Sequence, residues 1–121
     1  MLKSLREFHE LGFVHRNISP YSFVFKRFDD YKVFLIDLSL SRRWRSPEGK
    51  KYLPRNNVGL RGVPKYASIS SHEGKDLGRV DDLWSFYYIL IELAAPVPWE
   101  NINDKEEIYQ MKKKCHNNKL I

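Results

Sequence analysis

Residues 81–95 read DDLWSFYYILIELAA, and this stretch decides the fold. Two acids open it, where the dipole of a helix favours negative charge, and prolines at residues 96 and 98 follow its end. The stretch is apolar on almost every side, so it predicts a central helix that is buried on several sides. The side chains expected in the core are those of Trp84, Phe86, Tyr87 and Leu90.

The residues upstream of this helix predict one more helix and a pair of strands. Leucines at helix-like spacing over residues 2–11, followed by a glycine, predict a helix over that range. A tight loop at 13–20 and a strand at 21–25 are expected next. An acidic turn at Asp29-Asp30 then leads into a strand that opens at residue 31 or 32 and ends at 36. Two short strands around such a turn indicate a β-hairpin.

Two further segments complete the chain. Residues 39–71 contain several prolines and glycines and show no period, which predicts an irregular segment. A polar helix is expected from Asp104 to about His116, with the lysines at 112–114 on its solvated end. The sequence therefore predicts a mainly α-helical protein with a short β-hairpin.

Composition limits the classes of protein to consider. A chain of 121 residues with 42% hydrophobic residues suits one globular domain. The single cysteine, Cys115, excludes an internal disulfide framework, and the charged N-terminus is unlike a signal peptide. The longest apolar stretch, residues 86–91, is too short to span a membrane. We therefore expect an intracellular protein, cytoplasmic or nuclear, whose net charge of +6 favours anionic partners.

Four motifs follow one another along the chain, at residues 15–20 (HRNISP), 37–40 (DLSL), 62–68 (GVPKYAS) and 82–85 (DLWS). Their order resembles that of the C-terminal lobe of a protein kinase: H-R-D with K-P-x-N, D-F-G, the substrate-facing loop, and D-x-W-S on the central helix. The motif at residues 62–68, which stands in place of A-P-E, is similar to the corresponding motif of the casein kinase I group. Within that group the chain most resembles the tau-tubulin kinase branch, through LGFVHR at 11–16 and the motif that opens the central helix.

The resemblance covers nearly the whole chain and implies one partial kinase-like domain over residues 1–121. Its catalytic loop would lie at about 13–25, its activation segment at about 37–70 and its buried central helix at about 81–95. No G-x-G-x-x-G loop and no V-A-I-K strand occur in the sequence, so we expect the N-terminal lobe to be absent. The sequence leaves open whether Met1 is the true start of the protein.

The resemblance also implies that four positions of the catalytic machinery are altered. The catalytic aspartate of kinases maps to Asn17, whose amide is not a useful base at neutral pH. The phosphate-facing lysine maps to Ser19, and the second magnesium ligand maps to Ser22, whose hydroxyl is a poorer ligand. The threonine that bridges to the catalytic loop maps to Val63, which offers no side-chain hydrogen bond. We therefore predict a catalytically inactive chain.

Other positions that match the family keep their residue type. Asp37 stands at the D-F-G aspartate and is a weak candidate ligand for Mg²⁺, while Val24 maps to the floor of an adenine site. His15 and Arg16 are expected to scaffold the loop, and Asp82 is expected to cap the central helix and to anchor the loop backbone. ATP and Mg²⁺ are implied by the resemblance only, and we expect neither to be held tightly by this chain alone.

The segment from Arg42 to Lys65 carries eight Lys/Arg and a single acid, Glu48, and three interpretations of it stay open. It is a solvated activation segment, or an anion groove for acidic or phosphorylated protein segments, or a nucleic-acid surface around Trp44. The groove would be formed by Arg42, Arg43, Arg61 and Lys65. The nucleic-acid surface, the weakest of the three, would combine Arg42, Arg43 and Arg45 with the tryptophan ring.

Two classes of function follow from these observations. One is a pseudokinase-type binding module that recognises acidic or phosphorylated protein segments. The alternative is a Ser/Thr protein kinase, with ATP-dependent phosphotransfer to protein, represented by an incomplete chain. Nucleic-acid binding is a distant third, and the oligomeric state is not indicated by the sequence.

Overall fold

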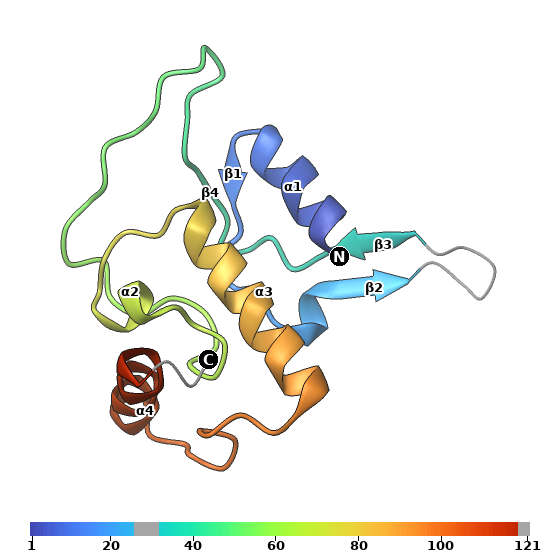
Figure 1. The fold of residues 1–121 in the computed structure, drawn as a ribbon. Coiled ribbons are helices and arrows are strands. Elements are labelled where there is room, and N and C mark those ends of the chain that lie inside the picture. The colour runs from blue at the N-terminus through green and yellow to red at the C-terminus, as the bar shows by residue number, and fades with distance from the viewer. Residues whose placement is uncertain (26–31, 119–121) are drawn as a thin grey trace.

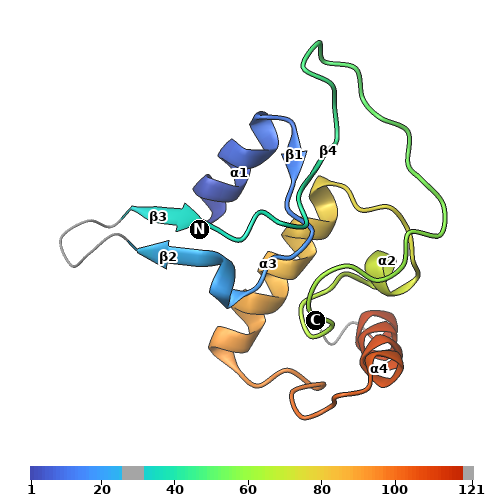
Figure 2. The ribbon, with the colours of Figure 1, turned by 180° about the vertical axis from the view of Figure 1, so that it is seen from behind.

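A single helix runs through the centre of the computed structural model, which describes residues 1–25 and 32–118 (Figure 1). This helix is α3 (Arg79–Ala94). Helix α1 (Leu2–Glu10) lies on one side of it, and α2 (Ile69–His72) and α4 (Lys105–Asn117) lie on the other, as the view from behind also shows (Figure 2). The described chain thus combines helices with small antiparallel sheets. None of its helices has the length and apolarity needed to cross a bilayer.

The expected hairpin is present. Strand β2 (Phe23–Phe25) pairs antiparallel with β3 (Val33–Leu35), with Val24 opposite Phe34. The strand expected at 21–25 is shorter than predicted because Pro20–Ser22 form a 3₁₀ turn, η1. Proline fixes the φ angle that the first position of such a turn requires, so Pro20 starts a turn rather than ending regular structure. The predicted acidic turn at residues 29–30 lies outside the described residues.

A second small sheet was not expected from the sequence. Strand β1 (Phe13–Val14) lies within the predicted tight loop and pairs antiparallel with β4 (Arg42–Arg43), which lies within the predicted irregular segment. Strands of two residues are too short to show a period of their own, because their pairing depends on tertiary contacts. Beyond β4 the chain arches away from the body before it returns to α2 (Figure 1).

The central helix begins two residues earlier than predicted, and a neighbouring residue provides its cap. The carboxylate of Asp81, not that of Asp82, accepts a hydrogen bond from the backbone N–H of Gly78 at 2.8 Å. The same carboxylate accepts a bond from the Ser68 hydroxyl at 2.7 Å. This leaves the carboxylate of Asp82 free to point towards the loop that follows β1.

The core joins α3 to both flanking groups of elements, but it does not surround the helix. Its buried members are Leu5, Ile18, Tyr66, Tyr88, Ile89, Val97, Trp99, Ile108 and Cys115. Of the four core residues predicted on α3, Phe86 is partly buried and packs against this cluster. Trp84, Tyr87 and Leu90 are 36%, 39% and 44% exposed, so the prediction for them is wrong. The helix is apolar all round, and the described chain covers only part of its circumference.

Lys112, predicted to be solvated, is fully buried. Its Nζ donates hydrogen bonds to the carbonyl oxygens of Pro64 at 2.7 Å and Ala67 at 2.6 Å, and it lies 4.8 Å from the centre of the Tyr88 ring. Helix α4 packs against α2, which places this side chain under the loop that precedes α2. Burial lowers the pKa of Lys112 to about 7, and burial lowers the pKa of the adjacent His72 to about 4.

Candidate functional site

The carboxylate of Asp82 holds the loop that follows β1. Oδ2 accepts hydrogen bonds from the backbone N–H of His15 and from Nε2 of His9, both at 2.8 Å, and Oδ1 accepts one from the N–H of Arg16 at 2.9 Å. Asp82 is 2% exposed, so these bonds are shielded from water. The start of α3 therefore fixes both the backbone of the loop and the end of α1.

His15 joins the same loop to the end of β3. Its Nδ1 accepts a hydrogen bond from the N–H of Asn17 at 3.2 Å, so the ring proton belongs on Nε2, which donates to the carbonyl oxygen of Ile36 at 2.9 Å. Arg16 has a positive φ of 68°, and its Nε donates to the carbonyl oxygen of Leu40 at 2.7 Å. The two residues thus connect the loop to both ends of the segment that contains Asp37.

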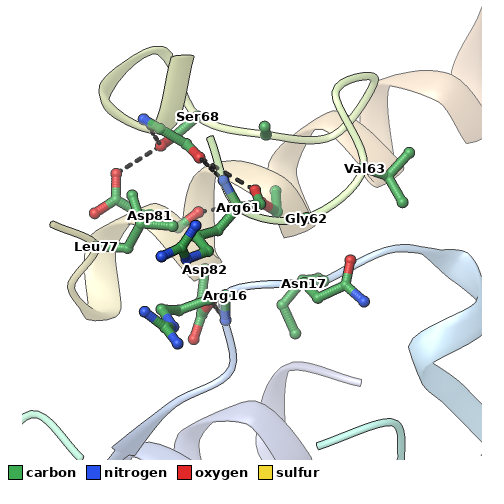
Figure 3. Close-up of a pocket in the computed structure, with 13 residues that line it drawn as sticks. Arg16, Asn17, Arg61, Gly62, Val63, Ser68, Leu77, Asp81 and Asp82 are labelled. Carbon is green, nitrogen blue, oxygen red and sulfur yellow. Dashed lines mark hydrogen bonds between the residues drawn. The ribbon is translucent and has the colours of Figure 1, made fainter. Parts of the chain in front are cut away.

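The segment at residues 61–63 lies directly on this loop. Gly62 has a φ of +83°, and a Cβ built on it would come within 2.8 Å of the carbonyl oxygen of Arg16. Figure 3 shows Arg61, Gly62 and Val63 passing over Arg16 and Asn17. The space left between the segments is about 10 Å³, which is room for about one water molecule.

Asn17, which the resemblance to protein kinases maps to the catalytic aspartate, faces Asp37. Its Nδ2 donates to Oδ2 of Asp37 at 3.3 Å, and the hydroxyl of Ser39 donates to Oδ1 at 3.0 Å. Both carboxylate oxygens therefore accept a hydrogen bond from the protein. An amide that donates in this way holds the Asp37 side chain, but it cannot take up a proton from a substrate hydroxyl at neutral pH.

Ser19 and Ser22 are buried in the turn η1 and bond to the loop itself. The hydroxyl of Ser22 donates to the carbonyl oxygen of Asn17 at 2.9 Å and accepts from the N–H of Ser19 at 3.0 Å. The hydroxyl of Ser19 accepts from the N–H of Tyr21 at 3.3 Å. Both side chains cap the turn, so neither replaces the cation or the second metal ligand of the family motif.

The residues at this site do not fit a Mg²⁺ ion held by two protein ligands. Both oxygens of Asp37 accept hydrogen bonds from the protein, and the hydroxyl of Ser22 is bonded to the backbone of Asn17 and Ser19. In the ranges 1–25 and 32–118, no three His, Cys, Asp or Glu side chains are grouped so that they could hold a metal ion. The two valines that the resemblance maps to the adenine floor and to the bridging threonine are both exposed: Val24, on β2, by 39% and Val63 by 43%.

Two arginines that lie far apart in sequence share the carboxylate of Asp76. Nη1 of Arg42 lies 2.7 Å from Oδ2, and Arg55 contributes its backbone N–H at 2.9 Å and its Nη2, at 3.2 Å from Oδ1. Burial raises the pKa of Asp76, but these hydrogen bonds outweigh that effect and lower it to about 2. Asp76 is therefore ionised at neutral pH.

Two more arginines complete a group that we name the arginine cluster: Arg16, Arg42, Arg55 and Arg61. Burial lowers the pKa of Arg16, and the positive charges of Arg61, Arg55 and Arg42 lower it further. Nη1 of Arg16 is buried and makes no hydrogen bond within the described residues. The guanidinium groups of Arg16 and Arg61 point to the same side of the pocket (Figure 3).

The structure thus brings together only two of the four residues expected to form the anion groove. Arg43 lies with its guanidinium 4.6 Å from the centre of the Phe13 ring. Lys65 pairs with Glu100 at 2.7 Å and with Glu92 at 3.0 Å, and the bond with Glu100 raises the pKa of Lys65. Sequence reasoning missed Arg16 and Arg55 as members of the cluster. Arg16 was assigned a scaffold role only, and nothing local to Arg55 indicates its neighbours.

Comparison with known proteins gives relatives for the whole chain. No family model matches it. The chain is 41% identical over its full length to a protein of Dictyostelium discoideum named "Probable serine/threonine-protein kinase", and it covers 25% of that protein. It is 34% identical to a "Putative serine/threonine-protein kinase" of Caenorhabditis elegans, again over its full length and covering 37% of the relative.

A third relative carries the name of the expected group. Over 93% of its length the chain is 31% identical to a "Putative casein kinase I" of C. elegans, and it covers 34% of that protein. The chain therefore spans a quarter to just over a third of the length of these relatives. Together they support the conclusion that the chain is a protein kinase-like segment.

Proposed function

We propose that the chain forms part of the C-terminal lobe of a kinase-like domain of the casein kinase I/tau-tubulin kinase type, which does not transfer phosphate and binds acidic or phosphorylated protein segments. The order of the motifs and the contacts of Asp82, His15 and Arg16 support the lobe assignment. In this proposal, the contacts of Asp82, His15 and Arg16 keep the loop in place, while the groups that would act on a substrate are replaced.

The loss of phosphotransfer is supported by the contacts of the residues at the catalytic positions. Asn17 donates to Asp37 instead of accepting a proton, and the hydroxyls of Ser19 and Ser22 are bonded within their own turn. Phosphoryl transfer depends on positioning and on neutralising the charge of the transferring group. The positions that the resemblance assigns to the base, the lysine and the second metal ligand hold Asn17, Ser19 and Ser22, and these side chains supply none of the three functions.

The binding role rests on one observation, the unpartnered and buried Nη1 of Arg16 within the arginine cluster. The carboxylate of Asp76 bonds to Arg42 and Arg55, whereas Arg16 and Arg61 form no ion pair within the described residues. Arg16 and Arg61 thus retain uncompensated charge at the surface between the two segments of Figure 3. Guanidinium groups bind phosphate and carboxylate through paired, charge-assisted hydrogen bonds, which suits an acidic or phosphorylated segment.

The experiment is a titration of the full 121-residue chain with a fluorescent phosphoserine peptide rich in Asp and Glu. Arg61→Gln removes one cluster charge, and we expect it to weaken binding about tenfold, because one charge-assisted contact is lost. Arg43→Gln removes the same charge from a residue outside the cluster and serves as the matched control, with an expected change below twofold. Binding of the wild-type chain should also weaken as salt rises.

Two results would contradict this proposal. Equal loss in Arg61→Gln and Arg43→Gln would reduce the interaction to net charge without a site. Tighter binding of single-stranded RNA than of the phosphopeptide, lost in Arg45→Gln, would favour a nucleic-acid surface around Trp44 instead.

A further inference from the structure

A groove of about 810 Å³ lies between α1, the residues after β4 and the start of α3. It shares no residue with the arginine cluster. The residues that line it are Leu2, Arg6, His9, Glu10, Trp44, Arg45, Arg79, Val80 and Leu83. Of the four motifs, the one at residues 82–85 contributes Leu83 to the lining, and the other three contribute no residue.

The groove has an apolar base built from both helices. Leu2 on α1 is 52% exposed, and Val80 and Leu83 on α3 are 60% and 43% exposed. Val80 and Leu83 are three residues apart, so they lie on the same face of α3. Large apolar side chains gathered in a concave surface favour contact with an apolar side chain of a partner.

Positive charge borders this base. Arg6 is paired with Glu10 at 3.0 Å, and His9 is committed to Asp82. Arg45 and Arg79 make no ion pair with a carboxylate anywhere in the described part of the chain. Their guanidinium groups lie 5.0 Å and 3.7 Å from the centre of the Trp44 ring. Glu10, the one acid that lines the groove, is neutralised, so the free charge there is positive.

We infer that this groove binds an acidic protein segment that carries one or two apolar anchor residues. Carboxylates of the segment would pair with Arg45 and Arg79, while the anchors would contact Val80, Leu83 and Leu2. The charge complementarity and the apolar base favour a peptide over a nucleic acid. Two guanidinium groups already contact the ring of Trp44, and its Nε1 donates to the carbonyl oxygen of His9 at 2.9 Å, so the ring is not free to stack on bases.

The test uses the full chain and a fluorescein-labelled peptide of twelve residues, made of Asp and Glu with one Leu and one Phe spaced three apart. The peptide carries no Ser, Thr or Tyr, so it contains no phosphate. We expect Leu83→Ser and Arg79→Gln each to weaken binding at least fivefold. Leu93→Ser changes the same residue type on the same helix outside the groove, at a residue 74% exposed, and is expected to bind as the wild type does.

A second comparison separates this groove from the arginine cluster. Arg61→Gln is expected to weaken the phosphoserine peptide about tenfold, but it should weaken the Leu/Phe peptide less than Leu83→Ser and Arg79→Gln do, because the apolar anchors direct that peptide to the groove. A peptide in which Ser replaces Leu and Phe should bind at least fivefold more weakly than the parent peptide, because its anchors are gone.

Three outcomes would overturn the inference. The first is equal binding of the parent and the Ser-substituted peptides, which would leave no role for the apolar base. The second is wild-type affinity in both Leu83→Ser and Arg79→Gln. The third is evidence of a different occupant. Displacement of the peptide by single-stranded RNA at lower concentration than by unlabelled peptide would make the occupant RNA. A dimer in sedimentation that Leu83→Ser dissociates, while the peptide fails to bind, would make the occupant a second copy of the chain.

Discussion

Gly62 lies so close to Arg16 that a Cβ on residue 62 would come within 2.8 Å of the Arg16 carbonyl oxygen. The backbone of residue 62 also has a φ of +83°, which L side chains rarely adopt. Two separate requirements, the positive φ and the close approach, therefore demand glycine at the point where residues 61–63 meet the loop that follows β1. The cost of the backbone strain and the cost of the clash can be measured separately, because Gly49 shares the positive φ but not the close approach.

Gly62→Ala is expected to lower the free energy of unfolding by about 3 kcal/mol, through backbone strain and the clash with Arg16. Gly49 has a similar φ of +91° but no atom within 4 Å of its Cβ position, so Gly49→Ala carries the strain alone. We expect it to cost about 1 kcal/mol. Urea unfolding followed by tryptophan fluorescence gives both values. Equal costs would show that residues 61–63 move away from the loop without penalty.

Asp82→Asn is expected to destabilise the fold by about 3 kcal/mol or more, because a buried carboxylate that accepts three hydrogen bonds loses its charge. The matched control is Asp104→Asn, at the exposed N-cap of α4, where Asn caps as well as Asp does and little change is expected. Thermal unfolding by circular dichroism compares the two. A small change in both variants would mean that the loop does not depend on Asp82.

Stability should fall as the solution is acidified from pH 9.5 to pH 5. Burial lowers the folded-state pKa of Lys112 to about 7 and that of His72 to about 4, so the unfolded chain binds more protons than the folded chain over this range. Lys112 contributes between its folded value and its ordinary value near 10.5, and His72 contributes between about 4 and 6.5. The ring of Tyr88 and the carbonyl oxygens of Pro64 and Ala67 also face the ammonium.

Lys112→Met should make the free energy of unfolding vary less with pH above pH 7, and His72→Gln should do the same below pH 6.5. We expect each variant to reduce the variation by on the order of 1 kcal/mol. Lys113→Met, at the exposed neighbour of Lys112, should follow the wild-type curve. The measurement is the free energy of unfolding in urea at each pH. Parallel curves for the wild type and Lys112→Met would show that Lys112 keeps its ordinary pKa in the folded chain.

Phosphotransfer is not expected to return when the base alone is restored. In a graft beneath the N-terminal lobe of an active relative, completed at its C-terminus, Asn17→Asp still lacks the cation, the metal ligand and the bridging hydroxyl. Residues that act as a unit are strongly non-additive, and each such element carries on the order of 10²–10³ in rate. The combined change Asn17→Asp, Ser19→Lys, Ser22→Asn and Val63→Thr should therefore exceed the product of the single effects.

The initial rate of phosphate incorporation into an acidic protein substrate measures each graft. The turn η1 adds a structural condition, because Ser22→Asn removes the buried bonds to Asn17 and Ser19. Folding of each variant is therefore checked by circular dichroism. High activity in the unrepaired graft would show that Asn17 supports catalysis by another route.

The elements predicted correctly from the sequence are those long enough to show a periodic apolar pattern. The helices α1, α3 and α4 and the β2–β3 hairpin carry enough apolar spacing and enough capping residues to be located within one or two residues. The pairing of β1 with β4 could not be predicted, since two residues hold no pattern and their register depends on partners 28 and 30 residues away.

The candidate site also contains residues whose place the sequence predicts and residues whose place it does not. The order of the motifs predicts that Asn17, Asp37 and Asp82 lie in one region, because each of them has a fixed place beside a recognisable motif. The burial of Lys112 and the inclusion of Arg55 beside Asp76 depend on which helix face or loop meets them. Lysine in a polar helix is solvated in most proteins, so nothing local distinguishes Lys112 from its two neighbours.

The hydrogen bonds to Asp82 also determine how the amides of the catalytic loop exchange with solvent. The N–H groups of His15 and Arg16 reach a carboxylate on α3, which α1 also contacts through His9. These amides are exposed only when the start of α3 separates from both segments, which amounts to opening the whole core. Deuterium uptake at His15 and Arg16 should therefore be among the slowest in the chain, which would give this loop the protection expected of a core strand.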